Sequence, residues 1–225
     1  MKILIITGGR IDHDSALRLL KEETFDHIIV VDGSLAFWDE VVMKEMPEAE
    51  FDQLVGDFDT ISPEILDKYI NRADITVHRF NPVKDNTDTD IAVRLALQLG
   101  EGGPLTVYLI GAFGTRVDHT LSTLQLLVRL KNAGAEGIII GAKNRVRLLR
   151  DETAVLQKKK QHGRYVSLIP VSEKLTGLHM TGFKYEVDGA EETLGDSLCV
   201  SNEITAERGE ITIGKGTAFL IESAD

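Results

Sequence analysis

The first 143 residues alternate short runs of branched apolar residues with longer stretches in which apolar positions recur every three or four residues. Short runs of this kind predict strands, and the longer periodic stretches predict helices. We expect strands at residues 2–7, 27–31, 53–55, 75–77, 105–110 and 137–140. Because strands and helices alternate, the pattern predicts a parallel sheet whose strands are joined by right-handed crossovers.

Three helices can be placed from their apolar stripes and their starting residues. One follows Ser62, a preferred N-cap residue, with Pro63 at its first position. The second covers residues 87–99, where Thr87 and Asp90 have the spacing of a capping box. The third covers residues 118–130 and has the same periodicity.

After about residue 144 the helical period disappears, and short apolar runs alternate with glycines. These runs predict strands near Val155 and at residues 165–169, 183–187, 197–200, 210–213 and 218–221. Many short strands without helices are typical of a small antiparallel β domain. We therefore predict an α/β protein with an N-terminal parallel-sheet domain over residues 1–143 and an antiparallel β domain over residues 144–225.

Composition narrows the class of protein. The 225 residues carry 25 basic and 36 acidic side chains, a net charge of −11, and 43% of them are hydrophobic. Such a chain is globular, and its charge disfavours nucleic acid and anionic membranes as partners. Its longest apolar runs fall far short of the ~20 residues that cross a bilayer. Cys199 is the only cysteine, which excludes an intrachain disulfide and is consistent with a cytoplasmic protein. For Cys199 itself we expect a structural role, because free cysteines are usually buried.

Aspartates follow the predicted strands at the edge where a parallel sheet binds ligands. Asp32 follows the strand at 27–31, and Asp57 and Asp59 follow the strand at 53–55. In extended backbone the last two side chains would point the same way, since side chains repeat every two residues. Carboxylates that converge in this way favour Mg²⁺. The alternative is that the pair only caps the helix after Ser62.

Two further clusters carry charged residues at helix starts. Residues 84–90 hold three acids and Lys84, which either faces a phosphate or pairs with Asp85 in solvent. Residues 110–119 form a glycine loop that opens a helix, where backbone N–H groups and the Arg116 guanidinium can gather around an anion. Asp118 can cap that helix, and for His119 we favour a packing role.

A nucleotide-binding motif near the C-terminus is rejected. Residues 209–216 almost fit a P-loop, but Gly216 occupies the position that requires serine or threonine. Gly8 and Gly9 likewise lack the spacing of a dinucleotide-binding loop.

The order and spacing of the clusters resemble the thiamine pyrophosphokinase family across almost the whole chain. The motifs are Asp32-Gly33, GDFDTI at 56–61, KDNTD at 84–88, GTRVDH at 114–119, GFKY at 182–185 and GDSLCVSNE at 195–203. The resemblance implies transfer of pyrophosphate from ATP to thiamine with Mg²⁺, yielding AMP. It also implies a Rossmann-like domain followed by a β-sandwich, assembled as a homodimer with a site shared between subunits.

Site residues carry over from this family by motif. Asp57, Asp59 and Asp88 would be catalytic and hold the metal and the ATP phosphates. Ser201 and Asn202 would contact thiamine. ATP would also be bound by Asp32, Lys84, Asp85, Thr87, Arg116 and Asp118.

Two other function classes use the same residues. A Mg²⁺-dependent phosphohydrolase would use the aspartates with water as the nucleophile, and would hydrolyse ATP without thiamine. A non-catalytic thiamine or nucleotide sensor would bind its ligand and release no AMP.

Overall fold

The computed structural model describes residues 1–80 and 86–225 and divides the chain into two compact units. Unit 1 covers Met1–Ala142 and unit 2 covers Lys143–Asp225. Each unit has a hydrophobic core of its own. The chain is a mixed α/β protein in which parallel and antiparallel strand pairing are segregated, the first in unit 1 and the second in unit 2.

Unit 1 is built on six parallel strands. They are β1 (Lys2–Ile6), β2 (His27–Val31), β3 (Gln53–Gly56), β4 (Thr76–Arg79), β5 (Thr106–Ile110) and β6 (Glu136–Ile140). Their spatial order is β6-β5-β1-β2-β3-β4, and every pair is parallel, as the alternation of elements predicts. The chain runs outward from β1 to β4 and then returns to the other side of β1 as β5. The direction of winding therefore switches between β1 and β5, which is where open parallel sheets form a ligand crevice.

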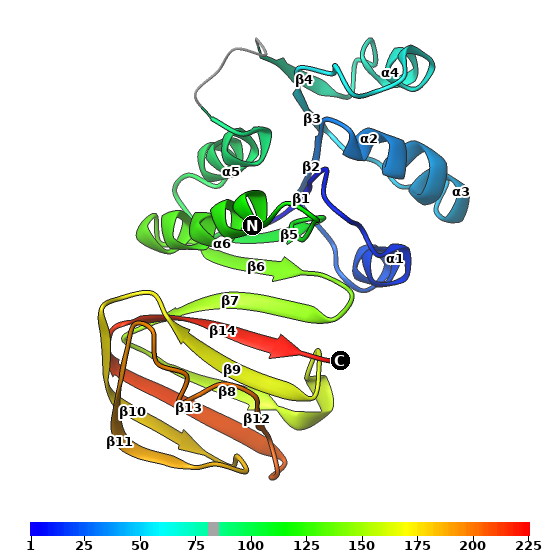
Figure 1. The fold of residues 1–225 in the computed structure, drawn as a ribbon. Helices are drawn as coiled ribbons and strands as arrows, with labels where there is room; N and C mark the ends of the chain where they lie inside the picture. Colours follow the sequence, from blue (N-terminus) through cyan, green and yellow to red (C-terminus); the bar gives the residue numbers. More distant parts are fainter. Residues whose placement is uncertain (81–85) are drawn as a thin grey trace. The chain divides into compact units, whose positions relative to one another are not determined.

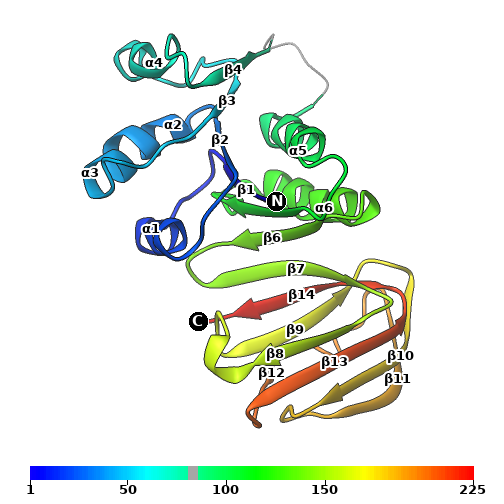
Figure 2. The ribbon, with the colours of Figure 1, turned by 180° about the vertical axis from the view of Figure 1, so that it is seen from behind.

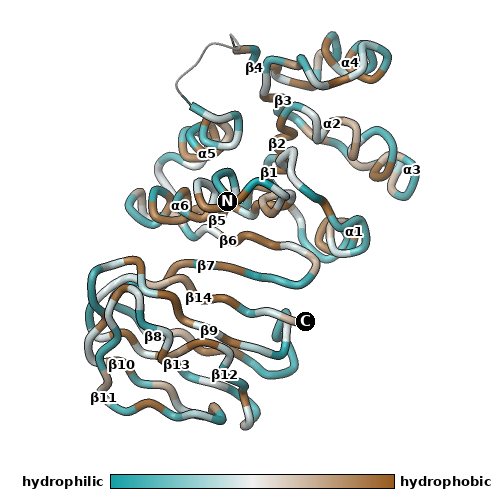
Figure 3. The backbone as a smooth tube through the Cα atoms, in the orientation of Figure 1, coloured by the Kyte–Doolittle hydropathy of each residue, from teal (hydrophilic) through white to brown (hydrophobic). Residues whose placement is uncertain are grey.

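Helices cover both faces of this sheet. They are α1 (His13–Glu22), α2 (Ser34–Phe37), the π-helix η1 (Trp38–Val42), α3 (Met43–Glu45), α4 (Pro63–Tyr69), α5 (Asp88–Leu99) and α6 (Val117–Asn132). Figures 1 and 2 show α1 to α4 on one face and α5 and α6 on the other. Because both faces are covered, the central strands are apolar on both sides, and residues 3–6 of β1 are fully buried. Figure 3 shows this as hydrophobic colour along β1 to β3.

The three helices placed from the sequence are present, and two begin with the expected caps. Ser62 accepts a hydrogen bond from the backbone N–H of Ile65, with Pro63 as the first residue of α4. Thr87 accepts one from the backbone N–H of Asp90 at the start of α5. The Asp90 carboxylate pairs with Arg94, so only the threonine half of the predicted capping box is observed.

Unit 2 consists of two antiparallel sheets. One has the order β12-β9-β14-β7 and the other the order β11-β10-β13-β8. The strands are β7 (Asn144–Arg150), β8 (Thr153–Gln157), β9 (Tyr165–Pro170), β10 (Lys174–Thr181), β11 (Val187–Thr193), β12 (Asn202–Glu203), β13 (Arg208–Lys215) and β14 (Thr217–Ser223). A 3₁₀ turn, η2 (Lys158–Lys160), separates β8 from β9. Strands of both sheets supply the core of this unit.

Two predicted strands of unit 2 are wrong. Residues 183–187 lie almost wholly between β10 and β11, and residues 197–200 form turns rather than a strand. The neighbouring strand β11 is mostly polar and lies at a sheet edge, so it has no apolar alternation to reveal it. The P-loop was rejected correctly, because Gly216 is a turn between β13 and β14 and no helix follows.

Candidate functional site

A cavity of about 530 Å³ lies at the carboxyl ends of the unit 1 strands. Its walls come from the loops after β1, β2, β3 and β5 and from the N-terminal turns of α5 and α6. The lining includes Thr7, Gly8, Gly9, Asp32, Asp57, Thr87, Asp88, Gly111, Gly114, Arg116, His119 and Thr123. Most of the sequence-predicted nucleotide and metal residues are thus brought to one pocket by the winding of the sheet.

Backbone contact between two glycine loops forms the floor at the switch point. A Cβ atom on Gly9 would lie 2.0 Å from the Gly111 carbonyl oxygen, and one on Gly111 would lie 2.2 Å from that of Thr7. Gly111 also has a φ of +74°, a conformation that favours glycine. The Thr7 hydroxyl and N–H both donate to the Ile110 carbonyl oxygen. Sequence reasoning did not assign Thr7 and Gly9 to the site, although a glycine pair directly after a buried strand signals such an approach.

Asp32 holds the loop that follows β3. Its Oδ1 accepts from the Phe58 backbone N–H at 3.1 Å, and its Oδ2 accepts from the Thr60 hydroxyl at 2.6 Å. The backbone of Asp32 is itself left-handed, with a φ of 45°. Nearby, the buried Ser34 hydroxyl donates to the Ile6 carbonyl and accepts from the Val31 N–H, which joins the ends of β1 and β2.

Asp57 and Asp59 converge by a different route from the one that the sequence suggested. Strand β3 ends at Gly56, and Phe58 has a φ of 65°, so the backbone between the two aspartates is not extended. A left-handed turn is unusual for an aromatic residue. It is held here by burial of the Phe58 ring and by the bond to Asp32. The turn, rather than the two-residue repeat of a strand, places the carboxylates together.

Carboxylate oxygens of Asp32, Asp57 and Asp59 all lie within 4.8 Å of one another. The negative charge of Asp57 raises the pKa of Asp59, and burial, Asp32 and Asp88 add to this effect. Such repulsion is relieved when a cation binds, and the all-oxygen donor set suits a hard divalent ion. Asp88 lines the same cavity but is not one of the three converging carboxylates. These residues could therefore hold a divalent metal.

The first turn of α5 forms another part of the cavity wall. Thr87 is the exposed N-cap residue, and Asp88 and Thr89 follow it in the first turn; all three line the cavity. Lys84 and Asp85, which the sequence assigned to ATP, lie outside the described residues.

Arg116 and Asp118 form an exposed pair at the start of α6. The guanidinium donates to both carboxylate oxygens, at 3.2 Å from Nε and 2.6 Å from Nη2. The hydrogen bond from Arg116 lowers the pKa of Asp118 to about 2. Arg116 and His119 line the cavity, whereas Asp118 does not, so Asp118 acts on the pocket through Arg116. His119, for which the sequence favoured a packing role, is an exposed lining residue.

The predicted thiamine residues lie in unit 2. Ser201 is exposed and left-handed, with a φ of 60°, and its N–H donates to the Ser167 hydroxyl. Asn202 is buried: its Oδ1 accepts from the N–H groups of Tyr185 and Glu203, and its Nδ2 donates to the Tyr185 carbonyl. These bonds give the Asn202 side chain a structural role in this conformation.

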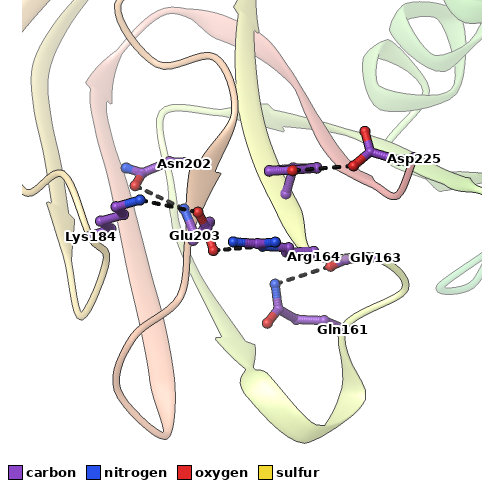
Figure 4. A network of polar contacts seen from close by, with 8 residues as sticks. Gln161, Gly163, Arg164, Lys184, Asn202, Glu203 and Asp225 are labelled. Carbon is purple, nitrogen blue, oxygen red and sulfur yellow. Dashed lines mark hydrogen bonds and ion pairs between the residues drawn. The ribbon is translucent and has the colours of Figure 1, made fainter.

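Ion pairs form at Glu203, the residue that follows Asn202. Glu203 accepts from Arg164 at 2.8 Å and from Lys184 at 3.4 Å (Figure 4). The short strand β12 is therefore fixed both by its backbone bonds to β9 and by this side-chain network.

Two family models match the chain. Residues 16–139 match the model described as "Thiamin pyrophosphokinase, catalytic domain". Residues 153–217 match "Thiamin pyrophosphokinase, vitamin B1 binding domain". A curated relative, the thiamine pyrophosphokinase of Bacillus subtilis (strain 168), is 35% identical over 170 residues, which cover 76% of this chain and 77% of that protein.

Solved structures agree with these matches. The crystal structure of thiamine pyrophosphokinase from Bacillus subtilis superimposes with a TM-score of 0.83 and 28% identity, covering 100% of both chains. That of thiamin pyrophosphokinase from Geobacillus thermodenitrificans gives a TM-score of 0.81 and 26% identity, covering 100% of this chain and 98% of that one.

Proposed function

The chain belongs to the thiamin pyrophosphokinase family, and we propose that it transfers the pyrophosphoryl group of ATP to the hydroxyl of thiamine. The products are thiamine pyrophosphate and AMP. One observation carries the proposal beyond family membership: the acidic, glycine-lined cavity lies at the winding switch point, where a nucleotide fits. The Rossmann-like description of unit 1 and the β-sandwich description of unit 2 belong to the same proposal.

We assign the Mg²⁺ ligands to Asp57, Asp59 and Asp88. Asp57 and Asp88 line one cavity, and Asp59 lies close enough that the negative charges of both raise its pKa. Asp32 completes the carboxylate cluster, but both of its oxygens already accept bonds from the 57–60 loop. We therefore give Asp32 the role of holding that loop beside the nucleotide. A bound Mg²⁺ would supply charge neutralisation on the transferring phosphates.

The side chains around the cavity then position the reactants. The thiamine hydroxyl oxygen bonds to the β-phosphorus while the bond from that phosphorus to the bridging oxygen of AMP breaks, and the hydroxyl proton is released to solvent. Arg116 presents a planar guanidinium suited to phosphate oxygens, and Asp118 holds it in place. The hydroxyl of Thr87 and the backbone N–H groups of the glycine loops offer uncharged hydrogen-bond donors to the phosphate oxygens. In-line positioning and electrostatic stabilisation account for most of the rate in such transfers.

Thiamine is assigned to unit 2, at Ser201 and next to Asn202. We propose a homodimer whose site combines unit 1 of one subunit with unit 2 of the other. Exposed apolar side chains support such an assembly: Val117 and Leu121 on α6, and Leu194, Leu198 and Val200 in unit 2. No helix within residues 1–80 and 86–225 is long and apolar enough to span a membrane. The cytoplasmic location expected from the sequence stays a prediction, with which the buried, free Cys199 is compatible.

Product analysis tests the proposed reaction. Purified protein, Mg²⁺, ATP and thiamine should yield AMP and thiamine pyrophosphate in equal amounts. ATP consumption at the same rate without thiamine would indicate a phosphohydrolase instead. Thiamine binding in a calorimeter, without AMP release, would indicate a sensor.

A further inference from the structure

The segment between β11 and β12, residues 194–201, carries Ser201 and is held mainly through its backbone. The Leu168 N–H of β9 donates to the Cys199 carbonyl, and the Ser201 N–H donates to the Ser167 hydroxyl, both at 2.9 Å. The side chains of Leu198 and Val200 point to solvent, with 59% and 43% exposure. Because these apolar side chains do not pack inward, the position of Ser201 depends on Cys199, whose side chain is buried in the core and whose backbone makes these bonds.

Glu192 supplies the bond from the opposite sheet. It lies on β11, is only 1% exposed, and its Oε1 accepts from the Cys199 N–H at 3.2 Å. Its Oε2 is buried and has no hydrogen-bond partner among the described residues. The preceding residue in the sequence, Glu191, is exposed and pairs with Lys174 at the surface. Two adjacent glutamates on one strand therefore occupy opposite environments.

A buried carboxylate with one unsatisfied oxygen destabilises a fold relative to an apolar side chain of similar size. The Cys199 thiol is no counter-charge, since burial and the nearby Glu192 raise its pKa to about 12. The hydrogen bond to this buried side chain comes from the Cys199 backbone N–H, so the geometry gives Glu192 the role of fixing that amide.

We propose that Glu192 is a positioning residue for thiamine, which acts by fixing the Cys199 backbone and, two residues on, the exposed Ser201. The inference rests on the proposed function, because it deepens the thiamine-binding role assigned to that segment. Glu192 does not contact the substrate. It determines the position of the segment at residues 194–201, whose Ser201 contacts thiamine.

Steady-state kinetics of the full-length protein test this role with three variants and a matched control. Glu192→Gln keeps an oxygen acceptor at the Cys199 amide. Glu192→Asp keeps the carboxyl group but shortens the reach by one methylene, and Glu192→Leu removes the acceptor altogether. The control is Glu191→Gln, which makes the same substitution as Glu192→Gln at the exposed neighbouring residue. Thermal melting of each protein is recorded in parallel.

We expect Glu192→Leu to raise the thiamine KM about fivefold to tenfold, the effect of losing one hydrogen bond. Its kcat and ATP KM should stay within about twofold of the unmodified protein. Its melting temperature should change little, because relief of the buried carboxylate offsets the cost of the unpaired Cys199 N–H. Glu192→Asp should raise the thiamine KM as well. Glu192→Gln and Glu191→Gln should leave it within about twofold. A merely structural role would instead lower the melting temperature and affect both substrates.

Three results would overturn the inference: an unchanged thiamine KM in both Glu192→Leu and Glu192→Asp, an equal rise in the KM of ATP, or a Glu192→Gln variant as impaired as Glu192→Leu. If Glu192→Leu does not fold, Glu192→Asp decides. Failure of the unmodified protein to form thiamine pyrophosphate would contradict the proposed reaction instead. In that case calorimetric thiamine affinity tests Glu192 separately, and equal affinities in the unmodified protein and the variants would refute its role.

Discussion

Two left-handed residues shape the acidic edge of the cavity. Asp32 and Phe58 have φ values of 45° and 65°, and such conformations cost roughly 1–3 kcal/mol in residues other than glycine. The Asp32 carboxylate accepts the Phe58 N–H, so each strained residue supports the other. The Arg79 guanidinium also lies over the Phe58 ring, 5.8 Å from its centroid. Strain is thus concentrated where Asp57 and Asp59 converge.

Replacement of Asp57 by asparagine tests the metal assignment. We expect turnover to fall by about 100-fold or more while the fold is retained, because the amide preserves the shape but removes a charged ligand. Steady-state rates with ATP and thiamine, together with circular dichroism, measure both effects. Asp74→Asn is the control, since Asp74 pairs with Arg72 at the amino end of β4. Near-normal turnover in Asp57→Asn would refute the role of this carboxylate.

The Arg116–Asp118 pair makes a pH-dependent prediction. Arg116→Ala should raise the pKa of Asp118 from about 2 toward its ordinary value near 3.9, because the guanidinium hydrogen bonds are lost. Since the pKa is lowered in the folded state, any stabilisation by the pair is present above about pH 4 and is lost as the pH falls toward 2. Carbon-detected NMR titration of the Asp118 carboxyl follows the shift. An unchanged titration in the variant would show that Arg116 does not control it.

At the scale of elements, a charged cluster links the two helices that form one side of the cavity. Asp90, in the first turn of α5, is buried and accepts from Arg94 at 2.9 Å. Arg129 Nη1 of α6 lies 2.5 Å from the other oxygen, which forms an ion pair between the two helices. Asp88 on α5 and Arg116 before α6 both line the cavity, so this cluster helps set the distance between them.

Asp90→Ala should therefore destabilise unit 1. We expect a loss of about 1–3 kcal/mol in the free energy of unfolding, less than for a fully buried pair because both arginines are partly exposed. Urea unfolding measures the change, and Asp74→Ala provides a surface ion pair for comparison. If both variants lose the same small amount, the cluster has no special structural role.

Elements of unit 1 were predicted more completely than those of unit 2. All six parallel strands were predicted within a few residues, because strands buried on both faces are continuous apolar runs. The polar edge strand β11 was missed, and β10 was missed because a register shift at residues 175–178 breaks its alternation. Helix α1 was not placed from the sequence, and neither were short helices such as α2 and α3, in which three or four residues show no period.

At the scale of the whole molecule, the proposed shared site predicts complementation between inactive subunits. Asp57→Asn disables unit 1, and Ser201→Arg should disable thiamine binding by unit 2 through bulk and repulsion of the cationic thiazolium. Random exchange of subunits makes half of the dimers mixed, each with one intact site, so about a quarter of full activity should return. The two variants are assayed separately, then mixed after subunit exchange. A mixture no more active than the separate variants would mean that the site is not shared between subunits.

The alternation of strands and helices, the parallel sheet, the position of the aspartates at strand ends and the family could all be read from the amino-acid sequence. Each of these depends on local periodicity or on motif spacing, which the chain carries without folding. The folded structure was needed to show that Phe58 turns Asp57 toward Asp59, that Asp118 acts through Arg116, and that Asn202 and Glu192 are buried among backbone donors. Those roles arise from contacts between residues far apart in the chain or from backbone angles that neighbours impose, and no local pattern encodes them.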